Sequence, residues 1–364
     1  MKYSIPIFRP SLPHMSTLSS FFDEIHVSKI YSNNGPLLQR FEQKFSEYCG
    51  NKIGIVGQAN GTLALQTAIL AKAGFGNSSK NICLMPSFTF SATVSAAMAS
   101  GYRIHFVDVD QETWMVDPDQ LRKHPLIEQV GLIVVTGAFG AMPDIKAWHV
   151  FASDLNISVV IDGAACADAF LGGHIETTYG LPVSLSFHAT KPFGIGEGGA
   201  VICDDPSQIE KVRACSNFGF DENRSATTIG TNSKMSEMNA AVGLCLLEEW
   251  NIRRTELMEL VSAYHEKLVA FGQFKMERNW VTTYPHILAE NAQQRAVIIS
   301  QLEADNIAHR RWWGLGCRTQ LAYQHFSSDT LPVTEDITER MIGLPFFADM
   351  NEQEIDRVAT AVIS

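Results

Sequence analysis

Short apolar segments that end in polar or charged residues dominate the middle of the chain. Three of them follow one another at residues 157–161, 183–187 and 200–203. The first ends at Asp162, the second leads to Lys191, and a glycine-rich turn at residues 194–199 precedes the third. Apolar runs of this length are typical of strands in a buried parallel sheet, where ligands lie beyond the carboxyl ends of the strands. We therefore expect Asp162 and Lys191 to face one pocket, although they are far apart in the sequence.

Lys191 has the surroundings of a nucleophile, because Pro192 and Phe193 follow it and an apolar segment precedes it. Burial lowers the pKa of a lysine and makes its amine a usable nucleophile. Pyridoxal phosphate (PLP) requires such an amine for its attachment and a carboxylate for its protonated pyridine nitrogen. The residues alone leave a second interpretation open, in which Lys191 is a solvated loop residue.

Strand-like and helix-like segments alternate through the first two thirds of the chain, which predicts an α/β fold with a mostly parallel, doubly wound sheet. The other expected strands are 53–56, 81–85, 103–109 and 132–136, and the expected helices are 62–72, 111–124, 145–155 and 207–215. Asn60 is a good N-cap for the first of these helices. The backbone N–H groups at the start of this helix make the turn a candidate anion site.

The glycines that follow Lys191 could be mistaken for a dinucleotide-binding motif. Gly194, Gly196 and Gly199 match G-x-G-x-x-G, which in dinucleotide-binding proteins closes a strand and opens a helix. Here an apolar strand, residues 200–203, follows at once. We therefore expect a tight turn that returns the chain from Lys191 into the sheet.

The remainder of the chain predicts a long helix and a smaller α+β unit. The helical pattern covers residues 234–271, a strand is expected at 280–290, and helices are expected at 293–304 and from Asn351 onward.

Composition restricts the partners. The formal net charge of -11 argues against nucleic acid or an anionic membrane surface. The seven cysteines show no disulfide framework, and we find neither a signal peptide nor an apolar run of membrane-spanning length. We expect a cytoplasmic protein with free thiols and no metal in its site.

The segment SFHATKPFGIGEGGA, residues 186–200, resembles the lysine segment of the PLP-dependent sugar aminotransferases of the DegT/DnrJ/EryC1/StrS family. The resemblance extends along almost the whole chain. It implies the PLP-dependent transferase fold type I, like aspartate aminotransferase, with a large domain and a smaller α+β C-terminal domain. The implied division is an N-terminal arm at 1–36, kept extended by prolines, a PLP-binding domain at 37–249 and a small domain at 250–364.

The resemblance also implies the roles of the site residues. Lys191 attaches PLP and then moves the proton, and Asp162 pairs with the pyridine nitrogen. The other cofactor contacts carried over are Gly61, Thr62 and Ser186 at the phosphate, Phe90 on the ring face, and Asn232 at the phosphate of the neighbouring subunit. The expected assembly is therefore a homodimer with shared active sites.

Candidate substrate contacts are less specific. His188 lies two positions after Ser186, and a packed histidine is the alternative. Arg310 and Arg311 precede two tryptophans and could meet a diphosphate, or form a solvated edge. Relatives commonly carry Gln or His near the PLP 3′-oxygen, where this chain has Ala165.

The implied function is transfer of an amino group from L-glutamate to a nucleotide-linked keto sugar, best a dTDP-4-keto-6-deoxy-hexose, for O-antigen or another glycan. A 3-keto sugar, an ordinary amino-acid transaminase and a non-catalytic PLP- or sugar-nucleotide-binding regulator remain as alternatives.

Overall fold

The computed structural model describes residues 3–76, 79–269 and 271–363. The helices are α1 (Met15–Ser28), α2 (Pro36–Tyr48), α3 (Gly61–Ala73), α4 (Ser91–Ala99), α5 (Pro118–Leu121), α6 (Ile145–Leu155), α7 (Ala167–Leu171), α8 (Pro206–Cys215), α9 (Glu237–Lys267), α10 (Ala292–Ala304), α11 (Pro332–Arg340) and α12 (Glu352–Ile363). The strands are β1 (Gly54–Gln58), β2 (Ile82–Pro86), β3 (Arg103–Val107), β4 (Val130–Thr136), β5 (Ser158–Asp162), β6 (Val183–Ser186), β7 (Gly199–Cys203), β8 (Phe274–Lys275), β9 (His286–Leu288), β10 (Ser327–Ser328) and β11 (Met341–Gly343).

A large sheet organises the first part of the chain, in the order β1-β7-β6-β5-β4-β2-β3-β10. Strands β6, β5, β4, β2, β3 and β10 run parallel to one another. Strand β7 is antiparallel to both of its neighbours, β1 and β6. The expected mostly parallel sheet is therefore confirmed. The turn after Lys191 leads directly into β7, so the glycines do not form a dinucleotide fingerprint.

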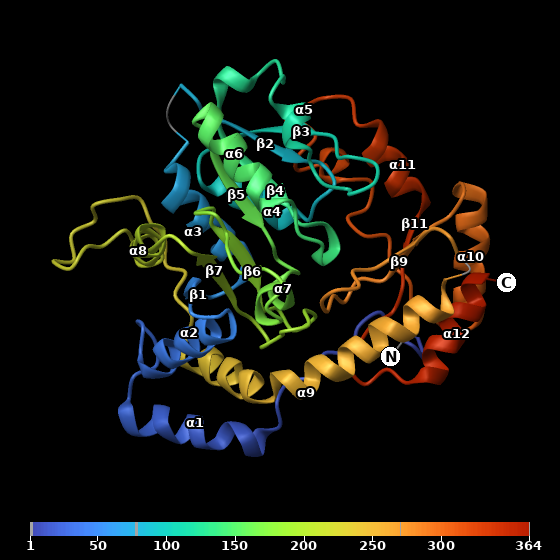
Figure 1. The fold of residues 1–364 in the computed structure, drawn as a ribbon, viewed down its shortest axis with the longest axis horizontal. Helices are drawn as coiled ribbons and strands as arrows, with labels where there is room; N and C mark the ends of the chain where they lie inside the picture. The colour runs from blue at the N-terminus through green and yellow to red at the C-terminus, as the bar shows by residue number, and fades with distance from the viewer. Residues whose placement is uncertain (1–2, 77–78, 270, 364) are drawn as a thin grey trace.

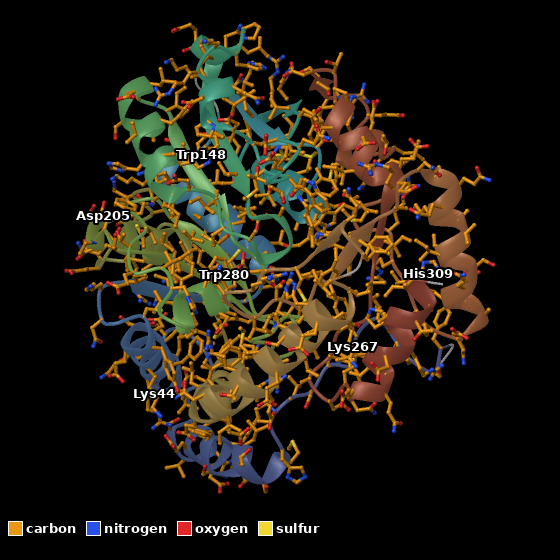
Figure 2. The ribbon with its side chains drawn as sticks, turned by 45° about the vertical axis from the view of Figure 1, so that its right-hand side comes forward. Lys44, Trp148, Asp205, Lys267, Trp280 and His309 are labelled. Carbon is orange, nitrogen blue, oxygen red and sulfur yellow. The ribbon has the colours of Figure 1, made fainter. Side chains whose placement is uncertain are left out.

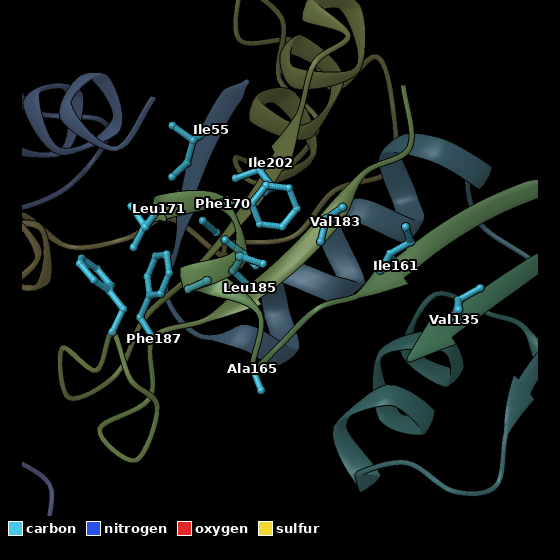
Figure 3. Close-up of a cluster of buried hydrophobic side chains, with 14 of the residues drawn as sticks. Ile55, Val135, Ile161, Ala165, Phe170, Leu171, Val183, Leu185, Phe187 and Ile202 are labelled. Atoms are coloured by element: carbon cyan, nitrogen blue, oxygen red, sulfur yellow. The ribbon is translucent and has the colours of Figure 1, made fainter. Parts of the chain in front are cut away.

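Both faces of this sheet are buried, because alternate residues of β2, β4, β5 and β7 belong to different hydrophobic clusters. One cluster packs the sheet against α3, α4 and α8, and the other packs it against α1, α2, α6, α7 and α9. Figure 3 shows part of the second cluster, where Val135, Ile161 and Val183 point from neighbouring strands toward the same side. Burial on both faces explains why the sequence shows continuous apolar runs here instead of alternation.

A small sheet, β11-β9-β8, forms the core of the C-terminal part together with α10 and α12. Helix α9 has 31 residues and runs from the large sheet to this second core, as Figure 1 shows. At its end Lys267, labelled in Figure 2, pairs with Asp356 of α12 at 2.8 Å. Strand β10 lies late in the chain but joins the large sheet beside β3. The boundaries at 36 and 249 stay predictions.

Three expected elements differ from the structure. The extended arm contains a helix, α1, whose Leu18, Phe21 and Ile25 are buried. The expected helix at 111–124 is reduced to Pro118–Leu121, because Asp110 accepts backbone N–H groups in a turn that precedes it. The strand expected at 280–290 is regular only at His286–Leu288.

All seven cysteines are buried and unpaired, as expected for free thiols. Burial raises the pKa of each of them, to about 12 at Cys49, Cys166 and Cys317. Among the described residues, no helix combines the length and the apolar character that are needed to cross a membrane.

Candidate active site

Asp162 is the last residue of β5 and is buried at the carboxyl end of the parallel sheet. Its carboxylate accepts hydrogen bonds from Thr93 Oγ1 at 2.7 Å and from the backbone N–H of Ala164 at 3.2 Å. Burial raises the pKa of Asp162, while these two bonds and the positive charge of Lys191 oppose the rise. A cation at this carboxylate would be strongly favoured, as a protonated pyridine nitrogen requires.

Three threonine hydroxyls form a hydrogen-bonded chain that ends at the carboxylate of Asp162. Thr93 Oγ1 lies 2.7 Å from Thr89 Oγ1, which in turn lies 3.0 Å from Thr136 Oγ1. Thr136 is also the β4 neighbour of Asp162 in the sheet register. Sequence reasoning missed these threonines, although Thr89 and Thr93 have the i, i+4 spacing of one helix face.

Lys191 lies in the loop between β6 and β7, and its Nζ is 2.6 Å from the hydroxyl of Tyr284. The ammonium also lies 4.9 Å from the centre of the Tyr284 ring. Tyr284 comes from the C-terminal part of the chain, so the contact joins the two parts at Lys191. No local pattern in the sequence indicated Tyr284, because 93 positions separate the pair.

The turn before α3 forms a close cradle with Ser186. Asn60 caps the helix by accepting the N–H of Leu63 at 2.9 Å, as predicted. A Cβ added at Gly61 would lie only 2.6 Å from Cβ of Ser186, so only glycine fits beside this serine. The Ser186 hydroxyl oxygen lies 2.9 Å from the same added Cβ, beside the N–H groups of the helix start, and such groups suit a phosphate. The phosphate contacts of Gly61, Thr62 and Ser186 stay predictions.

Two nearby phenylalanines have opposite environments. Phe88 is buried against Trp114, Phe139 and Trp313, which is core packing. Phe90 occupies the N-cap position of α4, and the residue is 62% exposed. An exposed apolar ring at this edge fits the role of a face on which a cofactor ring stacks.

His188 and Asn232 both lie outside the helices and strands, His188 just beyond β6 and Asn232 before α9. Strand β6 ends at Ser186, so His188 is in the following turn, where its Nδ1 lies 2.9 Å from Thr190 Oγ1. Asn232 is exposed and accepts a hydrogen bond from Lys234 Nζ at 2.6 Å. It ends a loop, residues 216–232, that projects from the body beside α8 in Figure 1. The roles of both residues stay predictions.

The segment around Arg310 and Arg311 contributes aromatic packing. Arg311 Nε donates to the carbonyl of Thr338 at 2.6 Å, and Arg310 lies over the Trp312 ring at 5.1 Å. Trp312 meets the ring of Tyr284 edge-on, with centroids 5.0 Å apart, and Trp313 stacks on Phe139 at 4.4 Å. The predicted substrate contacts of the arginines stay predictions.

The rings of Trp114, Phe139 and His286 form an aromatic layer next to Trp313. His286 lies 4.7 Å from Phe139 and 4.9 Å from Trp114, measured between ring centroids. Burial lowers the pKa of His286 to about 3, so this ring is neutral at physiological pH. The layer therefore presents no charge of its own to the site.

Ala165 is buried three positions after Asp162, and its methyl group offers no hydrogen bond. It packs close to Gly140, where an added Cβ would lie 3.1 Å from the carbonyl oxygen of Ala165. Its place in the fold is therefore that of a small packing residue.

A histidine and carboxylate cluster lies outside this site. Asp329 lies 3.0 Å from His105 Nε2 and 3.2 Å from His124 Nε2. The N–H of Leu126 approaches His124 Nδ1 to 3.2 Å, which places the proton of a neutral His124 on Nε2, toward Asp329. We interpret the cluster as a hydrogen-bonded tie between β3 and the segment after β10, and the expected absence of a metal stays a prediction.

The site fits PLP on three observations: a buried carboxylate, a lysine at the same sheet edge, and a glycine cradle at a helix start. The DegT/DnrJ/EryC1/StrS aminotransferase family model matches residues 17–363. The chain belongs to this family. It is a PLP-dependent aminotransferase with the PLP-dependent transferase fold, as the resemblance implied.

Relatives of the aminotransferase cover nearly all of it. The dTDP-4-amino-4,6-dideoxy-D-glucose transaminase of Shigella dysenteriae is 32% identical over 370 residues, 98% of each chain. Protein Rv3402c of Mycobacterium tuberculosis is 31% identical over 98% of this chain and 89% of its own. The crystal structure of DesI, analysed in the presence of its TDP-sugar product, has a TM-score of 0.85 and 28% identity, covering 98% of this chain and 91% of DesI.

Proposed function

We propose that this aminotransferase moves an amino group from L-glutamate to a keto sugar attached to a nucleoside diphosphate. The best candidate for the acceptor is a dTDP-4-keto-6-deoxy-hexose. The observation that carries the proposal is the full-length similarity to the Shigella dysenteriae dTDP-sugar transaminase, together with the fold shared with DesI. The product would serve the synthesis of O-antigen or another glycan, in the cytoplasm.

The residues of this chain supply positioning and proton transfer. When bound, PLP supplies an electron sink for the charge left when a proton leaves the donor. Asp162 favours a proton on the pyridine nitrogen, the Thr93 hydroxyl donates to its carboxylate, and Thr89 supports Thr93. Lys191 Nζ carries the proton between the two reacting carbons, and Tyr284 holds this amine at 2.6 Å from its hydroxyl.

We also propose a homodimer in which Asn232 of one subunit reaches the phosphate of the other. The loop of residues 216–232 supports this proposal, because it leaves the body of the chain and exposes Phe218 and Ile229. Exposed apolar side chains on a projecting loop are typical of a surface that a partner covers.

The experiment is to record the visible absorption of the purified protein before and after glutamate is added, and then to offer dTDP- and GDP-linked 4-keto and 3-keto sugars. We expect the band of the bound cofactor to bleach with glutamate and to recover with the dTDP-4-keto sugar. Lys191→Ala is the control, and its spectrum should not respond. Recovery with a 3-keto or GDP-linked sugar would correct the acceptor, and a band that ignores glutamate while bleaching with another amino acid would correct the donor.

A further inference from the structure

Asn232 is exposed, but the backbone around it is held on both sides. It forms an antiparallel bridge with Asn217 at the neck of the projecting loop. The next residue, Ser233, is buried, and its carbonyl accepts the N–H of Ala59 at 2.6 Å. The hydroxyl oxygen of Ser233 also lies 3.0 Å from Thr67 Oγ1 of α3. The backbone of Asn232 is therefore placed by its own subunit, and the freedom that remains is that of its side chain.

The two ends of the Asn232 amide have different contacts. Its Oδ1 accepts a hydrogen bond from Lys234 Nζ at 2.6 Å, whereas its Nδ2 makes no hydrogen bond to any residue that the structure describes. A lysine ammonium carries donors only, so it can hold the oxygen of an amide but not the nitrogen. The contact therefore fixes which way the amide is turned, with its N–H donors away from Lys234.

Lys234 is itself held without an acidic partner. Its Nζ also donates to Asn217 Oδ1 at 2.9 Å and lies 4.9 Å from the centre of the Phe218 ring, a distance at which an ammonium is attracted to the ring face. Burial lowers the pKa of Lys234, and no acidic group of the described residues opposes this effect. The hydrogen bonds of this ammonium are therefore directed to the two amide oxygens and not to a carboxylate.

We propose that Lys234 is a positioning residue, which orients the Asn232 amide so that its N–H groups donate to the PLP phosphate of the neighbouring subunit. This inference rests on the proposed homodimer and on the proposed contact of Asn232. An ionised phosphate oxygen accepts hydrogen bonds, so an amide turned the other way would place its own oxygen against it. Because Lys234 orders the amide before the cofactor binds, binding loses less side-chain entropy.

The test is a double-mutant cycle on the affinity for PLP, measured by titrating PLP into the cofactor-free protein and following its absorption. Lys234→Met removes the donors and keeps a long side chain. We expect it to raise the dissociation constant of PLP about 3- to 10-fold, as for the ordering of one polar side chain. In the Asn232→Ala background the same substitution should have no effect, because the amide on which Lys234 acts is gone.

Two variants serve as controls. Lys234→Arg keeps a cation that carries donors only, and it should restore most of the affinity for PLP. Lys146→Met makes the matched substitution at an exposed lysine of α6 and should leave the dissociation constant unchanged. Melting curves and light scattering check the fold and the assembly of every variant. If Lys234→Met does not fold, Lys234→Gln takes its place in the cycle, because glutamine is shorter, uncharged and polar.

An unchanged affinity for PLP in Lys234→Met would overturn the inference. So would an equal loss in the parent and Asn232→Ala backgrounds, because Lys234 would then act on the cofactor without Asn232. A monomeric parent protein, or an Asn232→Ala variant that binds PLP as tightly as the parent, would instead overturn the proposed contact between subunits, whatever Lys234 does.

Discussion

At the scale of the residue, Asp162 shows a conflict between function and stability. Its carboxylate is buried with hydrogen bonds from Thr93 and Ala164 but with no cationic partner in direct contact among the described residues. Because its pKa is raised, the folded cofactor-free protein keeps a proton that the unfolded chain releases at lower pH. The free energy of unfolding therefore falls as pH rises from the ordinary carboxyl range through the raised pKa.

We expect Asp162→Asn to remove this contribution. The cofactor-free variant should melt at a higher temperature than the parent at neutral pH, while its affinity for PLP and its transamination rate fall. The comparison is made by thermal melts of both proteins from roughly pH 4 to pH 8, a range that begins near the ordinary pKa of a carboxyl group. Asp204→Asn is the contrast, because hydrogen bonds from Thr178 and Gly180 outweigh burial and lower the pKa of Asp204, so its neutralisation should lower the melting temperature. A lower melting temperature for cofactor-free Asp162→Asn at neutral pH would contradict the argument.

Tyr284 gives a second prediction at this scale. Tyr284→Phe keeps the ring that packs on Trp312 but removes the hydroxyl that contacts Lys191 Nζ. Loss of one hydrogen bond of this kind should slow both half-reactions about tenfold, because a misplaced amine transfers the proton less well. Stopped-flow absorption with glutamate and with the keto sugar measures both rates, and the melting temperature should stay close to that of the parent. Equal rates in parent and variant would show that Lys191 needs no such support.

At the scale of the element, two buried acidic residues, Glu42 and Glu237, join helices together. Glu237 accepts the N–H groups of Leu37 and Leu38 at 2.8 and 3.0 Å, and so caps α2 from the start of α9. Glu42 accepts the N–H of Gly57 at 2.8 Å and pairs with Arg213 of α8 at 2.7 Å. Both carboxylates therefore position the helices that surround the cofactor turn.

Removal of the Glu237 cap should destabilise the fold without touching the cofactor. We expect Glu237→Ala to lower the free energy of unfolding by about 1–3 kcal/mol, because two buried N–H groups lose their acceptor. Urea unfolding followed by far-UV circular dichroism measures the change. Glu248→Ala on the same helix loses only an exposed pair with Lys44 and should cost at most about 1 kcal/mol. Similar costs for the two variants would contradict the capping role.

The sequence predicted those elements well whose structure is determined by residues within the element itself. The strands that end at Thr136 and Asp162, and the helix at Ile145–Leu155, follow from apolar runs and caps. The sequence did not predict features that depend on contacts between segments far apart in the chain. Helix α1 is stabilised by packing on α9, and Tyr284 and Thr93 reach Lys191 and Asp162 only after the sheet has assembled. The family resemblance named Asp162 and Lys191 but gave no sign of Tyr284 or Thr93.

At the scale of the whole molecule, the proposed shared site predicts complementation between two impaired enzymes. A mixed dimer of Lys191→Ala and Asn232→Ala chains has one site with the lysine of one subunit and the asparagine of the other. We expect such mixtures, unfolded and refolded together, to recover activity that neither variant shows alone. Activity that stays at the sum of the separate variants would indicate that each chain completes its own site.

The buried thiols make this protein convenient for spectroscopy. Thiol reagents attack the thiolate, and all seven native cysteines are buried with raised pKa values. A cysteine introduced at an exposed position, such as Leu321 or Val297 of α10, would therefore be labelled in preference to the native ones. Dyes at these two positions would report distances within the chain, and between the subunits of the proposed homodimer, with no need to replace any native cysteine first.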